Sequence, residues 1–162
     1  MKEPLPVKSH GALRRATPAD FGPLVALQQA AYARNRELLG VEPLPLQADY
    51  REIMENMEVW LADAGGRLLG ALILEPRADD ILIWSLACDP AAQSSGLGTW
   101  LLRAAEAKAR EYGRKTIRLY TGSKLSHLIG WYGRHGYEIE RVQAMSDRSV
   151  THMVKQLSTE SS

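Results

Sequence analysis

The sequence predicts a mixed α/β domain built on a mixed sheet, and three observations support this. Strand and helix patterns alternate along the chain in the order β-α-α-β-β-β-α-β-α-β-β. Two of the strand patterns, at residues 67–74 and 81–88, are almost continuously apolar, as expected of strands buried on both faces. The length of 162 residues suits one domain, which we place at 12–157 between a flexible lead-in (1–11) and a flexible tail (158–162).

The N-terminal part is expected to form one strand and two helices. Residues 12–16 are a short strand candidate. Residues 17–34 carry apolar side chains at helical spacing, with Thr17 as the N-cap and a proline at the first helical position. A proline-punctuated loop at residues 40–45 then leads into a weaker helix pattern at residues 47–56.

The middle of the chain is expected to form three consecutive strands. The first two, at residues 59–64 and 67–74, are joined by Gly65 and Gly66, which supply the positive φ angles of a two-residue hairpin turn. The third, at residues 81–88, follows after another turn.

The C-terminal half is expected to supply two helices and three strands. They are a helix at 97–112 closed by Gly113, a strand at 116–121, a helix at 125–135 capped by Gly136, and strands at 137–141 and 149–157.

Composition excludes several classes of function. Lys plus Arg (20) nearly balances Asp plus Glu (19), so the net charge of +1 gives no bulk reason to bind nucleic acid or an anionic membrane. The single cysteine, Cys88, rules out an internal disulfide, and the four histidines are not at zinc spacing. No apolar run approaches the ~20 residues of a membrane span, and the first residues lack the apolar segment of a signal peptide. We therefore expect a cytoplasmic protein with no metal, nucleic-acid or membrane partner.

One loop is a candidate anion-binding site. It joins the strand at 81–88 to the helix at 97–112 and contains Gly96 and Gly98. Its amides are expected to point into one concavity at a helix N-terminus, which favours a phosphate or pyrophosphate. Two nucleotide motifs fit poorly, because a P-loop needs a lysine after the last glycine and a dinucleotide fingerprint needs a small residue where Leu101 stands.

The pattern Gln93-x-x-Gly96-x-Gly98 resembles the pyrophosphate loop of the GCN5-related N-acetyltransferase (GNAT) superfamily, whose members bind acetyl-CoA. Residues 86–90 resemble the end of the family's fourth strand, where a bulge splays two strands apart. Residues 132–137 resemble the family's late tyrosine-glycine-aromatic signature. The resemblance implies the acyl-CoA N-acyltransferase fold with a splayed central sheet.

Further positions resemble one bacterial subgroup of small GNAT proteins whose substrate is uncertain. These positions are Ala31, Tyr32, Arg36, Leu39, Gly40, Pro43, Pro45, Leu46, Asp49, Tyr50, Leu119, Tyr120, Thr121, Met153 and Lys155. Gly122 and Leu128 depart from the subgroup, because asparagine is usual at both positions. The corresponding hydrogen bonds near the cofactor arm are therefore not expected.

The resemblance also implies how acetyl-CoA is held. Loop amides would bind the pyrophosphate, and backbone groups of the strand end would pair with the pantetheine arm like an added strand and donate to the thioester oxygen. The expected cofactor-binding residues are Leu86, Ala87, Cys88, Gln93, Ser94, Ser95, Gly96, Leu97, Gly98 and Thr99. The thiol of Cys88 is not required, because direct attack by an amine needs no covalent intermediate.

Tyr132 is the expected catalytic residue. The resemblance places its phenol beside the coenzyme A sulfur, where a protonated hydroxyl can donate to the departing thiolate. The alternative is that Tyr132 only packs its helix with Trp131 and Tyr137. No base is assigned, because Trp84 stands where many relatives place Glu or His, and ordered water is one substitute.

Candidates for contact with the acceptor lie mainly in the first two helices and their loop. They are Tyr32, Asn35, Arg36, Tyr50 and, on the fourth strand, Trp84. Arg36 could pair with a substrate carboxylate, although a solvated helix face is the favoured explanation of this residue. Trp84 could be an apolar wall or a cation–π platform, with core packing the favoured alternative.

The expected function is transfer of an acetyl group from acetyl-CoA to a primary amine of a small molecule or peptide, by direct attack and with coenzyme A as product. The alternative, motivated by the missing base, is a catalytically weak acyl-CoA-binding regulatory module. No metal is expected, and a homodimer is left open.

Overall fold

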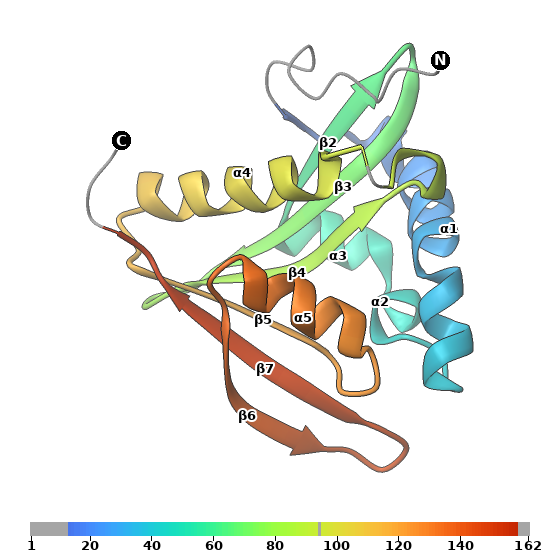
Figure 1. The fold of residues 1–162 in the computed structure, drawn as a ribbon. Helices are drawn as coiled ribbons and strands as arrows, with labels where there is room; N and C mark the ends of the chain where they lie inside the picture. Colours follow the sequence, from blue (N-terminus) through green and yellow to red (C-terminus); the bar gives the residue numbers. More distant parts are fainter. Residues whose placement is uncertain (1–12, 94, 159–162) are drawn as a thin grey trace.

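The computed structural model describes residues 13–93 and 95–158, which form one seven-stranded sheet with helices on both faces (Figure 1). The expected lead-in at 1–11, the last four residues of the expected tail, and Ser94 lie outside the described residues. The strands are β1 (Arg14–Arg15), β2 (Glu58–Ala64), β3 (Arg67–Pro76), β4 (Ile81–Cys88), β5 (Thr116–Gly122), β6 (Glu138–Ala144) and β7 (Ser149–Gln156). They follow the spatial order β1-β2-β3-β4-β5-β7-β6, with β4 and β5 parallel and the other neighbours antiparallel.

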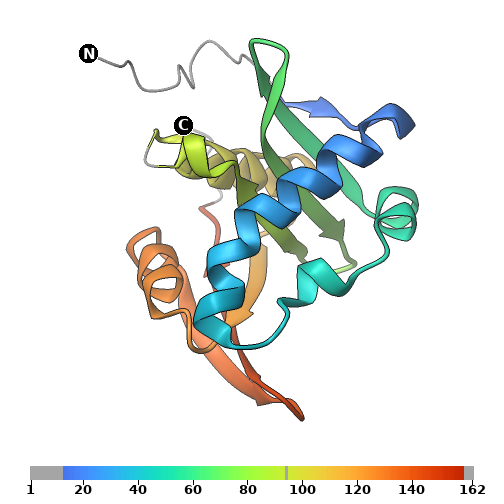
Figure 2. The same cartoon turned by 90° about the vertical axis from the view of Figure 1, so that its right-hand side faces the viewer.

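Two pairs of helices cover the two faces of the sheet. The helices are α1 (Phe21–Leu39), α2 (Leu44–Gln47), α3 (Tyr50–Asn56), α4 (Leu97–Glu111) and α5 (Ser126–Arg134), with 3-10 turns η2 (Pro18–Asp20) and η3 (Pro90–Ala92). Turning the molecule by 90° brings α1 to the front and leaves α4 behind the sheet (Figure 2). The sheet is thus covered by α4 and α5 on one face and by α1 and α3 on the other.

The apolar run of β3 supplies both cores. Leu72 and Leu74 are buried in the cluster formed with α4, whereas Ala71 and Ile73 are buried in the cluster formed with α1. Side chains alternate across a strand, so a continuous apolar run serves both layers. The prediction of a strand buried on both faces is confirmed.

Most predicted elements are present, and the main differences concern the N-terminal third, although β3 and β6 also run two and three residues further than expected. The first strand contains only two residues, Arg14 and Arg15. Helix α1 continues five residues beyond the expected end at residue 34, because Leu39 still packs into the protein and Gly40, at φ 72°, ends the helix. The loop expected at 40–45 ends in the helical turn α2, whose first turn contains a proline, a residue well suited to that place.

The sheet splays between β4 and β5. The two strands pair only through Ile81, Leu82 and Ile83, and diverge beyond this point. The pairing with β3 also shifts here, since Ile73 faces Ser85 while the next residue, Leu74, faces Ile83.

Trp84 is therefore the extra residue of a β-bulge. The bulge lies at Trp84 and not within residues 86–90, where the sequence placed the splayed strand end. One consequence is that both Trp84 and Ser85 face α1. Another is that the rest of β4 has no β5 partner, so its edge is open to the gap.

Candidate active site

A cavity of about 550 Å³ occupies the gap between β4 and β5. Its walls come from α1, the diverging halves of β4 and β5, the start of α4, and α5. Residues 83–88 all line it on the β4 side, so Leu86, Ala87 and Cys88 lie along the open strand edge. The cavity therefore connects the α4 face of the sheet with the α1 face.

The start of α4 forms one end of this cavity. Gln93, Gly96, Gly98 and Thr99 line it, and Gly96 adopts φ 91°, a conformation that favours glycine. No described residue accepts a hydrogen bond from the amides of Gly98 or Thr99. These first-turn donors and the positive end of the helix dipole suit an anion.

Two other loop residues have structural contacts. The hydroxyl of Ser95 donates to the Ala92 carbonyl at 2.5 Å and accepts from the amide of Leu97 at 3.3 Å. The side chain of Leu97 is fully buried in the core. Neither residue lines the cavity, so they shape the loop that carries the free amides.

The charged groups on the cavity wall are all arginines. Arg34, Arg134 and Arg148 line it, and no Asp or Glu of the described residues does. Arg34 and Arg134 form no ion pair with any described residue, whereas Arg148 is held by Asp147 at 3.0 Å and by the Glu42 carbonyl at 2.6 Å. Two guanidinium groups are thus available for an anion.

Tyr132 both packs its helix and lines the cavity. Its ring meets Trp131 and Tyr137 edge-on, with centroids 5.0 and 5.8 Å apart. Burial raises the pKa of the Tyr132 phenol well above its ordinary value. Its hydroxyl has no hydrogen-bond partner among the described residues, so the cavity contains a neutral donor.

Cys88 is half-buried on the same strand edge. Burial, aided by the charge of Asp89, raises the pKa of the Cys88 thiol to about 12. The thiol is therefore neutral near pH 7 and a poor nucleophile. This favours a reaction that does not pass through an acyl-cysteine.

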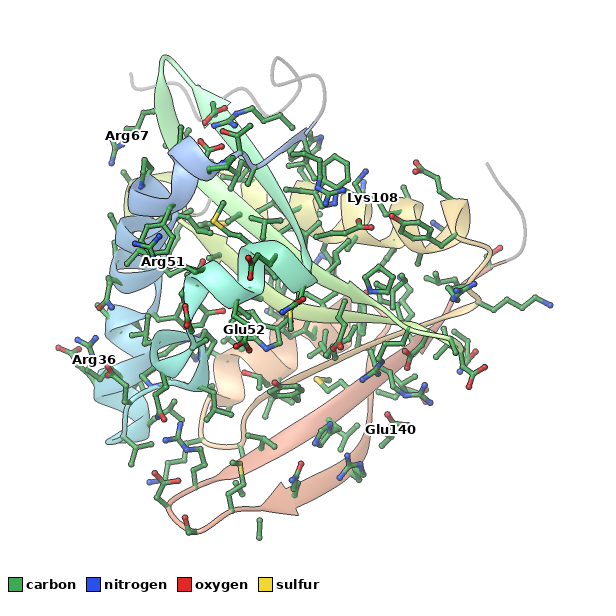
Figure 3. All side chains as sticks on the ribbon, turned by 180° about the vertical axis from the view of Figure 1, so that it is seen from behind. Arg36, Arg51, Glu52, Arg67, Lys108 and Glu140 are labelled. Atoms are coloured by element: carbon green, nitrogen blue, oxygen red, sulfur yellow. The ribbon has the colours of Figure 1, made fainter. Side chains whose placement is uncertain are left out.

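The structure brings three of the five candidate acceptor residues to the cavity: Tyr32, Asn35 and Trp84. Arg36 does not line it. This side chain is exposed on the outer side of α1 and pairs with Glu42 at 2.7 Å (Figure 3). Tyr50 also lies outside the cavity wall, and its ring supports Trp84 edge-on at 6.1 Å.

Sequence reasoning missed two buried polar residues, Ser85 on this wall and Gln28 behind it. Gln28 and Ser85 are 1% and 3% exposed and hydrogen-bond to each other. The available signal was the presence of Gln28 at an apolar position of the first helix, four residues before Tyr32. Ser85 carried no comparable signal, because its orientation depends on the bulge at Trp84.

The fold and this cavity define the class of protein. Residues 24–137 match the model of the Acetyltransferase (GNAT) family, and the chain belongs to that family. The chain is 30% identical over 92 residues to an uncharacterized N-acetyltransferase, YvbK, of Bacillus subtilis (strain 168). The match covers 56% of this chain and 59% of that protein, less than two thirds of its length.

Solved structures share the fold at low sequence identity. The ribosomal-protein-S18-alanine N-acetyltransferase of Escherichia coli is 17% identical, with a TM-score of 0.74 over 93% of this chain and 96% of that one. A GNAT family acetyltransferase of Elizabethkingia anophelis with acetyl-CoA bound is 17% identical, with a TM-score of 0.67 over 90% and 97%. The PaiA N-acetyltransferase of Thermoplasma acidophilum, in complex with coenzyme A, is 18% identical, with a TM-score of 0.72 over 90% and 98%.

Two further features are absent from the described residues. No group of three or more His, Cys, Asp or Glu side chains among them is arranged to hold a metal ion. None of the helices in this part of the chain is both long and apolar enough to cross a membrane.

Proposed function

We propose that the protein transfers an acetyl group from acetyl-CoA to the primary amine of a small molecule or peptide, by direct attack. The observation that carries the proposal is the cavity in the β4–β5 gap. It has free amides of α4 at one end, the Tyr132 hydroxyl within it, and α1 on its other side. A cavity through the sheet lets donor and acceptor approach from opposite faces and meet in a fixed orientation.

The α4 side suits the anionic part of coenzyme A. The amides of Gly98 and Thr99 lack partners among the described residues, and Arg134 of α5, on the same face of the sheet, adds positive charge. A Cβ at Gly98 would lie 3.6 Å from the Trp131 ring, so the loop comes close to α5 without a side chain there. We propose that the loop holds the pyrophosphate and that the open edge of β4 at Leu86, Ala87 and Cys88 pairs with the pantetheine arm.

The reaction itself balances with the groups present. The amine nitrogen attacks the thioester carbon, a C–N bond forms, the C–S bond breaks, and the amine loses one proton. No carboxylate of the described residues lines the cavity, so we propose that this proton passes to water. The Tyr132 hydroxyl donates its proton to the leaving sulfur and is reprotonated from solvent.

The acceptor side is formed by Tyr32, Asn35 and Trp84. The test is release of coenzyme A thiol from acetyl-CoA across a panel of amines: neutral amines, amino acids, polyamines and peptides with a free N-terminus. We expect at least one acceptor to raise thiol release well above hydrolysis, with the acetylated amine identified by mass.

The lack of a carboxylate on the described cavity wall favours a second candidate, an acyl-CoA-binding regulatory module with weak catalysis. Calorimetry with acetyl-CoA separates the two. Tight binding without turnover on any amine would support the module and reject the enzyme.

A further inference from the structure

A buried chain of polar side chains leads from the inside of α1 to the cavity. Nε2 of Gln28 donates to Oγ of Ser85 at 3.0 Å and to Oη of Tyr50 at 2.8 Å. Oγ of Ser85 lies 2.8 Å from Oη of Tyr32, a residue of the cavity wall. The bulge at Trp84 makes this chain possible, because it turns Ser85 toward α1.

The donor hydrogens available in this network determine which residue donates in the Ser85–Tyr32 hydrogen bond. Gln28 uses both amide hydrogens, and Tyr50 donates its hydroxyl hydrogen to the Pro45 carbonyl at 2.6 Å. Among the described residues, Oη of Tyr32 is then the acceptor that remains for the Ser85 hydroxyl. If Tyr32 donated instead, Ser85 would keep a buried hydrogen without an acceptor, which is unfavourable. Ser85 therefore donates to Tyr32, and the hydrogen of Tyr32 is free to point into the cavity.

The amide of Gln28 holds this direction in place. Its Oε1 is buried without a partner among the described residues. With the amide reversed, Nε2 would leave two buried hydrogens unpaired, and the Tyr50 hydroxyl would be drawn from the Pro45 carbonyl to Gln28. The observed orientation leaves the smaller number of unpaired groups. The buried Gln28 therefore determines the direction in which the Tyr32 hydroxyl donates its hydrogen bond.

We propose that Tyr32 donates a hydrogen bond to the carbonyl oxygen of the bound acetyl thioester, and that Ser85 and Gln28 are positioning residues that aim this hydrogen. The inference rests on the acetyltransferase function proposed above. Oη of Tyr32 sits beside Ser85, directly before the β4 edge at Leu86, Ala87 and Cys88. A backbone amide of that edge and the Tyr32 hydroxyl would form a two-donor site for the oxygen as negative charge develops on it.

Tyr32 acts in this proposal without losing its proton. Burial raises the pKa of the Tyr32 phenol to about 12, so the hydroxyl stays protonated throughout the neutral range. The chain behind it cannot take a proton from the amine, because it begins at Gln28, which contributes only donor hydrogens to it. Tyr32 is thus a hydrogen-bond donor, and the proton of the leaving sulfur still comes from Tyr132.

The decisive experiment is infrared difference spectroscopy of the full chain with acetyl-CoA labelled by ¹³C at the carbonyl. A hydrogen bond to this oxygen lowers its stretching frequency. We expect the band of bound acetyl-CoA to move to higher frequency in Tyr32→Phe, and to move partway in Ser85→Ala. Tyr112→Phe is the matched control, because it removes a tyrosine hydroxyl that bonds to Glu58, outside both the buried network and the cavity wall, and we expect it to leave the band in place.

Turnover with the best acceptor of the amine panel gives a second readout. Loss of one such donor is expected to lower kcat on the order of 100-fold in Tyr32→Phe, with little change in the Kd of acetyl-CoA. Ser85→Ala is expected to lower kcat less, and the double variant to be no slower than Tyr32→Phe alone, because Ser85 acts through Tyr32. Ser85→Thr, which keeps the hydroxyl, should recover the wild-type band.

The outcomes separate the two proposals. An unchanged band in a Tyr32→Phe protein that still binds acetyl-CoA would overturn the role of Tyr32 alone. Equal shifts in Tyr32→Phe and Tyr112→Phe would also overturn it, because a general loosening of the protein would then explain both. Failure of the wild type to bind acetyl-CoA would overturn this inference together with the proposed function.

Discussion

On the α4 side of β4 the cavity presents main-chain amides and glycines, whereas on the α1 side it presents side chains that hydrogen-bond one another. The α4 side has Gly96, Gly98 and the free amides of the helix start. The α1 side has Tyr32 and Trp84, supported from behind by Gln28. The difference teaches that a ligand common to a family can be held by backbone geometry, while an individual acceptor must be recognised by side chains.

Gly96→Glu is expected to have the largest effect, and it acts on the α4 side. A carboxylate there would face the proposed pyrophosphate, at a loss of about 4 kcal/mol or roughly 10³-fold in the Kd of coenzyme A. Calorimetry with coenzyme A measures the loss. Gly96→Ala is the matched control, because it imposes the strain of φ 91° on a side chain without adding charge. Normal affinity in Gly96→Glu would show that the loop does not hold the phosphates.

Tyr132→Phe tests the chemical step between the two sides. Removing the hydroxyl should lower kcat on the order of 100-fold while the Kd of acetyl-CoA stays within about twofold. The dependence of kcat on pH gives a second test. Because burial raises the pKa of Tyr132, the acid form persists, and kcat of the wild type should not fall between pH 7 and 9. An unchanged kcat in the variant would reduce Tyr132 to a packing residue.

Trp84→Ala tests the α1 side. Loss of the indole from the cavity wall should raise KM for the acceptor about tenfold, near 1.4 kcal/mol, and leave the Kd of acetyl-CoA unchanged. Trp84→Phe keeps an aromatic wall and serves as the control. Equal changes in the KM for the acceptor and the Kd of acetyl-CoA would contradict the proposal that the two sides of β4 bind different substrates.

Asp20→Asn is expected to have the smallest effect on activity, because Asp20 lies outside the cavity. Arg14 binds the Asp20 carboxylate at 2.9 Å, and this contact lowers the pKa of Asp20 to about 2. A pKa below its unfolded value means that the stabilisation is present above about pH 4 and is lost as the pH falls toward 2. The variant should lose about 1–2 kcal/mol of unfolding free energy at pH 7, and less at pH 3. Denaturant titrations at both pH values measure this, and KM for donor and acceptor should not move.

The sequence predicted the α4 side better than the α1 side, for a physical reason. Glycines at a helix start leave a compact local pattern, so Gln93, Gly96 and Gly98 could be found within six consecutive residues. The fold was equally accessible, because the apolar runs of β3 and β4 and the glycines of the β2–β3 turn are local signals; Gly65 and Gly66 indeed adopt φ 61° and 76°.

The α1 side depends on positions far apart in the chain. Gln28 and Ser85 are 57 residues apart, and their contact depends on the register of β4. No local pattern indicates a bulge at Trp84, so the sequence alone does not place Ser85 beside α1. Tyr32 was a candidate without an assigned partner, because its partner became visible only once the strand and α1 were packed together.

The bulge also has a genetic consequence. Trp84 is the one residue of β4 without an opposite in β3, so an in-frame deletion of its codon would leave Ile83 and Ser85 adjacent with their side chains already on alternate faces. The shortened strand could continue its pairing with β3 without moving either core. With the kink gone, it would extend beside β5 and close the gap that holds the cavity. Deletion of this one codon is therefore expected to remove the open site while leaving the folded domain in place.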